Sequence, residues 1–408
     1  MVEGGTSADA AWRVHGLFLA LVLYGLLSAP APPALRAAET VIGALLLCAM
    51  GVRRPLLVAT GHALGTPGLP SWQAAGILAL AWLLWVPLLR GMALGWAARD
   101  MLRDVVPLLY LFLPVLLVPV LRHAGRRAVE ALALGLALAG LLFTLRWWWQ
   151  AEWGFGAVGT RVMPEGDAYL LNAPSVLFAA VALPVWAFDL ALRGGGLRRC
   201  AAAGLAVGGV LCLAALAGTV HRVALGLSIL SFLILALWWL RRAPLPMLVL
   251  LLAAGGLSLA FADMLLGAFG QVAEKTRITG ANARWEEMAA MLALLGESPF
   301  SFLFGQGWGA LVANPAVGGW RVSYTHSLFS YTLVKAGTLG FLMLFGYLWA
   351  MAWQARALLR ENPPLAWALL PPLLMALGFH TSFKYLDTGL LLTLAMLAAE
   401  RWNRLSVR

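Results

Sequence analysis

The sequence predicts an all-α, polytopic integral membrane protein with about twelve transmembrane helices. Hydrophobic residues make up 62% of the 408 residues, and charged residues make up only 12%. The mean hydropathy is +0.84. A water-soluble core cannot bury that much apolar surface, whereas lipid can surround it. The Leu- and Ala-rich stretches also lack the alternation of a transmembrane barrel, and helices satisfy their own backbone hydrogen bonds in hydrocarbon.

Twelve apolar stretches can each supply the roughly 17–25 helical residues that cross a bilayer, once interfacial residues are added. The first is expected to be a retained span, because no small-residue cleavage site follows Tyr24. The stretches are residues 14–29, 38–52, 72–89, 105–121, 128–145, 169–192, 200–218, 222–240, 245–266, 328–353, 365–379 and 386–399.

The charges of the loops orient these spans. With a cytoplasmic N-terminus, the inside segments hold sixteen arginines and six acidic residues, whereas the outside segments hold twelve residues of each sign. Because cytoplasmic loops carry the excess of Lys and Arg, both termini are expected in the cytoplasm of a bacterial inner-type membrane. The net charge of +11 is then mainly a topology signal, and nucleic acid is not expected as a partner.

Two predicted outside segments are too long to be turns, and functional loops often have such lengths. One covers residues 146–168 and opens with three tryptophans, which are typical of an interfacial anchor. The other, residues 267–325, separates nine spans in 1–266 from three spans in 326–408. Within it, Trp285, Met288, Leu292 and Leu295 recur at spacings of three and four, which predicts an amphipathic helix on the membrane surface or capping the bundle.

Cations gather at the outer boundary of the later spans. Arg222 opens the eighth span, Arg277 and Arg284 lie in the long loop, and Arg321 and His326 precede the tenth span. Guanidinium groups match phosphate oxygens and do not lose their charge. The grouping therefore suggests a site for an anion. Each residue also has a plainer interpretation, and these stay open: an interfacial anchor for Arg222, a contact with Glu287 for Arg284, and a capping histidine for His326.

Metal chemistry is not expected from the sequence. The outer segments contain no HExxH, CxxC or DxD pattern, and the three cysteines lack metal-ligand spacing. Glu286 and Glu287 are adjacent and so point in different directions on a helix. We therefore expect no metal and no cofactor. Lys335, the one cation inside a predicted span, is expected to face the bundle interior and to pair there.

An ordered set of motifs in the second half of the chain resembles the O-antigen ligase and polymerase superfamily. In that family an arginine begins a span, and a second arginine opens an external helix that leads to a proline and a G-x-G. A histidine then precedes a span that carries a G-x-x-G. The corresponding residues here are Arg222, Arg284, Pro299, Gly305, Gly307, His326, Gly337 and Gly340.

The resemblance implies an inverting, metal-independent glycosyltransferase with a periplasmic active site. Its donor would be a glycan on undecaprenyl diphosphate, and its acceptor lipid A–core oligosaccharide, as in lipopolysaccharide biosynthesis. Arg222 and Arg284 would stabilise the charge of the leaving diphosphate, and His326 would take the proton of the attacking hydroxyl. Arg277, Arg321 and Arg161 would hold donor or acceptor phosphates. Two alternatives stay open: a polymerase that uses a second lipid-linked glycan as acceptor, and a non-enzymatic transporter of lipid-linked glycan.

Overall fold

The computed structural model describes residues 7–30, 36–150, 169–263, 266–267, 270, 273, 277 and 284–406. Of the described residues, 84% are helical. Within the described residues, the one sheet is a short antiparallel ribbon of β1 (Val312–Ala313) and β2 (Arg321–Val322). The predicted all-α class is therefore confirmed.

Each of the twelve predicted spans overlaps with helix in the described residues. Several of them are interrupted: residues 105–121 divide between two helices, residues 365–379 end in a π-helical turn, and the α-helix of residues 169–192 begins only at Pro174. The helices are α1 (Ser7–Leu27), α2 (Ala37–Met50), α4 (Ser71–Ala93), α5 (Ala98–Leu111), α6 (Leu113–Leu121), α7 (Arg126–Gln150), α8 (Pro174–Leu192), α9 (Gly196–Gly218), α10 (Arg222–Leu240), α11 (Pro244–Ala260), α15 (Leu328–Ala355), α17 (Pro363–Leu374) with η5 (Met375–Phe379), and α18 (Leu386–Ser406).

Shorter elements connect these helices. They are α3 (Arg53–Ala59), η1 (His62–Gly65), η2 (Arg122–Ala124), η3 (Leu170–Asn172), α13 (Arg284–Gly296), α14 (Pro299–Phe304), η4 (Pro315–Val317), α16 (Leu358–Glu361) and η6 (Thr381–Lys384). The helix predicted in the long loop is present as α13.

Seven helical segments in the described part of the chain are long and apolar enough to cross a membrane. The bent pair α2 and α3, with an angle of 81°, would make an eighth. Residues 11–27, 244–260 and 363–379 form shorter apolar helices. The chain is therefore a multi-pass membrane protein, and the number of twelve spans stays a prediction.

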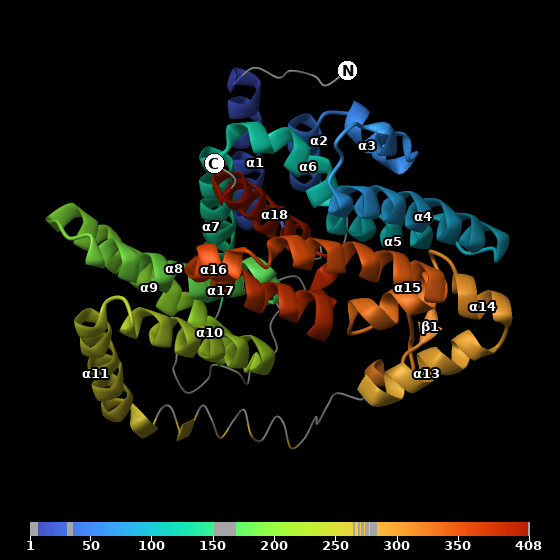
Figure 1. Ribbon diagram of the computed structural model, residues 1–408. Coiled ribbons are helices and arrows are strands. Elements are labelled where there is room, and N and C mark those ends of the chain that lie inside the picture. Colours follow the sequence, from blue (N-terminus) through green and yellow to red (C-terminus); the bar gives the residue numbers. More distant parts are fainter. Residues whose placement is uncertain are drawn as a thin grey trace.

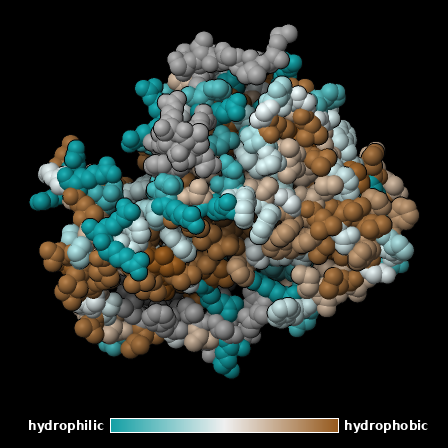
Figure 2. Space-filling model, in the orientation of Figure 1, coloured by the Kyte–Doolittle hydropathy of each residue, from teal (hydrophilic) through white to brown (hydrophobic). Residues whose placement is uncertain are grey.

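The helices differ in what they contact. Residues 386–399, the first fourteen of α18, are all buried, whereas α10 and α11 leave leucines such as Leu237 (63%), Leu245 (74%) and Leu252 (67%) exposed. Hydrophobic residues cover much of the face seen in Figure 2, including the region of α10 and α11. An exposed apolar surface of this extent is expected where helices face lipid.

The glycine-rich stretch after α14 docks against a proline break in α4. Pro87 has no N–H, so the carbonyl of Leu83 loses its helical donor. The indole N–H of Trp308 donates to that carbonyl at 2.8 Å, and the backbone N–H of Trp308 donates to the Pro87 carbonyl at 3.0 Å. A Cβ on Gly307 would lie 2.4 Å from the Gly91 nitrogen, so only glycine permits this approach.

A second break, in α15, receives the other end of the same stretch. Gly337 has φ +67° inside α15 and releases carbonyls from the helical pattern. The backbone N–H groups of Gln306 and Gly307 donate to the carbonyls of Val334 and Lys335 at 2.7 and 2.9 Å. Figure 1 shows α4, α5 and α15 side by side, with α13 and α14 at one end. The two breaks fix the polypeptide that carries α13.

Lys335 pairs inside the bundle, which confirms the expectation for it. Its Nζ lies 2.5 Å from Asp104 Oδ2 and donates to the Ala310 carbonyl at 2.5 Å. The Tyr331 hydroxyl donates to Asp104 Oδ1 at 2.9 Å, and the Gly309 N–H donates to Asp104 Oδ2 at 2.9 Å. A buried carboxylate with three donors, one of them a cation, is satisfied. The pair joins α5, α15 and the glycine-rich stretch.

Candidate active site

The site forms where helix ends and their flanking residues meet. Arg284 is the first residue of α13, and Arg222 is the first residue of α10. His326 lies two residues before α15, whose N-cap Ser327 accepts a hydrogen bond from the Ser330 N–H. α13 packs against α15, and α10 contacts η5. Segments that are distant in the sequence therefore share one region.

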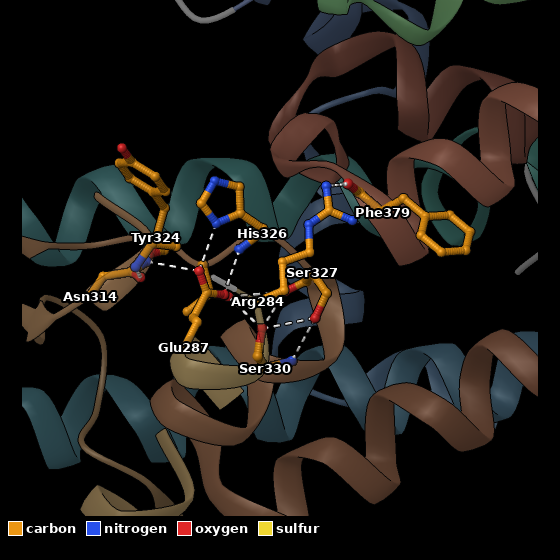
Figure 3. Close-up of polar contacts among 10 residues, drawn as sticks. Arg284, Glu287, Asn314, Tyr324, His326, Ser327, Ser330 and Phe379 are labelled. Atoms are coloured by element: carbon orange, nitrogen blue, oxygen red, sulfur yellow. Dashed lines mark hydrogen bonds and ion pairs between the residues drawn. The ribbon is translucent and has the colours of Figure 1, made fainter. Parts of the chain in front are cut away.

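A carboxylate–imidazole pair lies at the centre of the site. Glu287 is buried, with 3% of its surface exposed. Its Oε2 lies 2.6 Å from His326 Nδ1, and its Oε1 accepts the His326 backbone N–H at 2.8 Å. The Asn314 side chain donates to Oε2 at 3.0 Å. In Figure 3 the carboxylate of Glu287 lies between Asn314 and His326. These contacts fix both the ring and the backbone of His326.

The protonation states of the pair follow from its contacts. Burial by itself would raise the pKa of Glu287, but the hydrogen bonds from His326 and Asn314 outweigh burial and lower it. Glu287 is thus ionised at neutral pH and is purely an acceptor. The Nδ1 of His326 must then carry the hydrogen, so the Nε2 of a neutral ring is an acceptor. A proton acceptor on a fixed ring is suited to general base catalysis.

Arg284 lies beside the pair and is held by backbone. Its Nη2 donates to the Phe379 carbonyl at 2.9 Å, as drawn in Figure 3. Its Nε is buried and has no hydrogen-bond partner among the described residues. Burial lowers the pKa of Arg284, the charge of Glu287 raises it, and the nearby charge of Arg222 lowers it. The guanidinium groups of Arg284 and Arg222 are therefore close enough to repel each other, and a bound anion would relieve that repulsion.

Two further histidines complete the cluster. The rings of His221 and His380 are 5.8 Å apart between centroids. His380 follows the π-helical turn directly, and its Nδ1 accepts the Ser382 N–H at 3.2 Å. Burial lowers the pKa of His380 to about 3, with further lowering by His221, His326 and Arg284. This imidazole therefore stays neutral across the physiological range.

The structure brings His326, Arg284 and Arg222 into one region. The three arginines that were expected to hold phosphates are not shown in this region. Arg321 is exposed on β2, and its Nη2 donates to the Leu311 carbonyl at 3.1 Å. Arg277 is exposed, and Arg161 lies outside the described residues. Within the described part of the chain, no three His, Cys, Asp or Glu side chains are grouped as metal ligands would be.

The sequence did not single out Glu287 as the partner of His326, nor His221, His380 or Asn314 as parts of the site. The apolar stripe expected for α13 packs against the protein only in part, and its place on the membrane surface stays a prediction. The helix buries Glu287, Met291 and Leu295, whereas Trp285 and Leu292 are 78% and 55% exposed. The packed face includes an acidic residue because His326 and Asn314 satisfy it. The one sequence signal that could have pointed to Glu287 was its place three residues after Arg284 in the same predicted helix.

Comparisons with known proteins do not assign a family. No protein-family model matches the chain, and no curated protein matches it. The helical membrane architecture and the geometry of the site are therefore the basis for an argument about function.

Proposed function

We propose that the chain is an O-antigen ligase-like glycosyltransferase of the bacterial inner membrane. It moves a glycan from undecaprenyl diphosphate to lipid A–core oligosaccharide at a periplasmic site. The observation that supports this most directly is the convergence of Arg222 and Arg284 with an imidazole that Glu287 orients. The chain contributes a base and two fixed cations at one place, which is what transfer from a diphosphate needs.

The proposed reaction is a single displacement. The oxygen of an acceptor hydroxyl attacks the anomeric carbon of the glycan's reducing-end sugar. The bond from that carbon to the diphosphate oxygen breaks, and the diphosphate leaves with the electron pair. The hydroxyl proton passes to His326 Nε2, and Glu287 stabilises the imidazolium that forms. Attack opposite the leaving group inverts the anomeric carbon.

The guanidinium groups act on the leaving group. Charge develops on the diphosphate as the bond breaks, and Arg284 and Arg222 are cations that neither lose their charge nor need a metal. The buried Nε of Arg284 is a donor that has no partner among the described residues. Arg277, Arg321 and Arg161 are kept as candidates for phosphates at the edge of the site.

The proposal includes the orientation in the membrane. Twelve spans with both termini in the cytoplasm would put the arginine-rich loops inside. They would put α13 and the starts of α10 and α15 at the periplasmic surface, where lipid A–core is available. The lipid tail of the donor would enter between spans, and the small residues of α9, such as Gly208 and Gly209, allow close packing there.

A polymerase that takes a second lipid-linked glycan as acceptor would use the same residues and stays the alternative. A transporter is disfavoured by one observation. Transport pathways present charged side chains to a cavity within the membrane, whereas Lys335 and Asp104 are buried against each other at 1% and 0% exposure.

Reconstitution decides between these functions. The purified chain would be placed in proteoliposomes with an undecaprenyl-diphosphate glycan, and offered either lipid A–core or a second donor molecule. We expect glycan on lipid A–core, detected by mass spectrometry. Elongated glycan on the lipid carrier would identify a polymerase. Movement of the donor between leaflets without a new glycosidic bond would refute both enzymes.

A further inference from the structure

We propose that His380 is a further substrate-binding residue, which donates a hydrogen bond from Nε2–H to a phosphate oxygen of the lipid diphosphate. This inference rests on the proposed function and adds a contact that the sequence motifs do not contain. It assigns a task to the π-helical turn η5 and to the residue that follows it. The argument depends on the tautomer of the ring, the anchoring of Arg284 and the charges around the ring.

The backbone of η6 fixes the tautomer of His380. The Ser382 N–H donates to His380 Nδ1 at 3.2 Å. A backbone N–H can only donate, so Nδ1 is an acceptor and the hydrogen of the neutral ring is on Nε2. The two nitrogens lie on different edges of the imidazole. The Nε2–H therefore points away from the turn that binds Nδ1.

The π-helical turn couples His380 to Arg284. Phe379, the last residue of η5, accepts the Arg284 Nη2 hydrogen bond at 2.9 Å. His380 is the next residue, so the carbonyl that orients the guanidinium and the imidazole that we assign belong to adjacent residues. Single π-helical turns concentrate at functional sites because they displace residues from the regular helical positions. Here the carbonyl of Phe379 accepts from Arg284, and His380 lies near Arg284 and His221.

The surroundings of the ring favour a neutral donor over a third cation. The ring is 5.8 Å from that of His221, and it feels the charges of His326 and Arg284. Protonation beside these groups would add repulsion, and burial opposes it as well. A neutral N–H adds a hydrogen bond to an anion without adding a third positive charge beside Arg284 and Arg222.

A purely structural role for His380 would be to cap η6 through Nδ1. Two substitutions separate that role from the proposed one. In His380→Asn the amide oxygen can still accept the Ser382 N–H near the position of Nδ1, but the donor at Nε2 is lost. In His380→Gln the longer amide places an N–H near the position of Nε2. The two variants are close in size and polarity.

The experiment measures binding of farnesyl diphosphate to the full chain in detergent by calorimetry, and the ring tautomer by ¹⁵N NMR. We expect His380→Asn to weaken binding roughly tenfold, as for one lost hydrogen bond to a charged group. We expect His380→Gln to bind within about threefold of the wild type. The spectrum of the wild type should show His380 as the Nε2–H tautomer at pH 5 to 8.

Three results would overturn the inference: His380→Asn binding as tightly as the wild type, His380→Gln losing as much as His380→Asn, or a wild type that does not bind the diphosphate. Glycan transfer is measured separately. If glycan is transferred and all variants bind the diphosphate equally, His380 has no role in binding, and the proposed function is unaffected. Weaker binding in His380→Asn by a chain that transfers no glycan would support the contact and contradict the enzyme.

Discussion

At the scale of single residues, the environment of Glu287 decides what His326 can do. A carboxylate in the same helix position but exposed to water would leave the ring free to rotate and to exchange tautomers. Here Glu287 is buried, ionised and shared with Asn314 and a backbone N–H, so it fixes the ring in one state. The adjacent Glu286 is exposed, and no comparable hydrogen bond joins it to another described residue.

Glu287→Gln tests this orientation. An amide can donate to Nδ1 and favours the tautomer with hydrogen on Nε2, which cannot accept a proton. We expect kcat for glycan transfer to fall by roughly a hundredfold or more with KM for the donor nearly unchanged. Glu286→Gln is the matched control and should retain activity. If the two substitutions lower kcat equally, Glu287 does not orient His326 for catalysis.

The pH dependence of stability tests the burial of His380. Its folded-state pKa of about 3 lies below the ordinary value of 6.5. Between these values the unfolded chain binds a proton that the folded chain does not, so the free energy of unfolding falls as the pH falls. The groups that act on the ring are His221, His326 and Arg284.

We therefore expect His380→Gln to lose less stability than the wild type between pH 7 and pH 4.5, measured by thermal unfolding in detergent. His62→Gln, at an exposed histidine, is the control and should follow the wild type. If the wild type and His380→Gln respond identically to acid, the ring is not held neutral by its surroundings.

At this scale the sequence predicted residue types better than partners. Arg222, Arg284 and His326 could be chosen because several cations and a histidine gather at the outer boundary and match an ordered set of family motifs. A partner for Lys335 could be expected, but not its identity as Asp104, which is more than two hundred residues away. Pairings of this kind depend on which helices are neighbours, and local periodicity does not contain that information.

At the scale of elements, the two breaks at Pro87 and Gly337 position the site. Each break exposes carbonyls that would be costly inside a membrane, and the glycine-rich stretch supplies the missing donors. The sequence contains both residues, and the G-x-G and G-x-x-G motifs could be recognised. Their mutual docking could not be predicted, because a motif does not specify which carbonyls its N–H groups reach.

Gly337→Ala tests the docking. With φ +67°, and a Cβ that would lie 2.3 Å from the Leu303 carbonyl oxygen, alanine is both strained and obstructed. We expect the unfolding free energy to fall by at least about 2 kcal/mol in a denaturant titration. Gly346→Ala, in the same helix but with open space around it, should be neutral or stabilising. A neutral Gly337→Ala would contradict the docked arrangement.

The buried pair between α5 and α15 can be tested by a double-mutant cycle. Lys335→Met or Asp104→Asn alone removes one partner of a fully buried pair, and we expect each to cost about 3–5 kcal/mol. The double substitution should cost clearly less than the sum, because neither charge is then left unpaired. Additive costs, measured by equilibrium unfolding, would show that the two groups do not interact.

The approximate positions of the long helices were predictable because hydropathy changes sharply at the charged loops. The interruptions were not. α5 and α6 separate at Phe112, and α17 turns into a π-helix at Met375. Both helical segments contain internal prolines, but a proline in a membrane helix can kink, break or be tolerated, depending on its neighbours.

At the scale of the whole molecule, composition predicted the membrane class because no water-soluble fold can bury so much apolar surface. It did not predict the arrangement of the bundle, since lipid-facing and buried helices are nearly equally apolar. α18 and α11 illustrate this: the first is buried through residue 399, whereas the second exposes most of its length. The orientation and the full number of spans follow from loop charges and remain predictions.

The most direct test of the account compares rates of glycan transfer in the presence of EDTA for His326→Ala, Arg284→Ala, and the matched controls His62→Ala and Arg193→Ala. The controls remove an exposed histidine and an exposed arginine. The account predicts that both controls transfer glycan at the wild-type rate without metal, whereas His326→Ala and Arg284→Ala lose at least about a hundredfold and still insert in the membrane. Wild-type transfer by either site variant would contradict it.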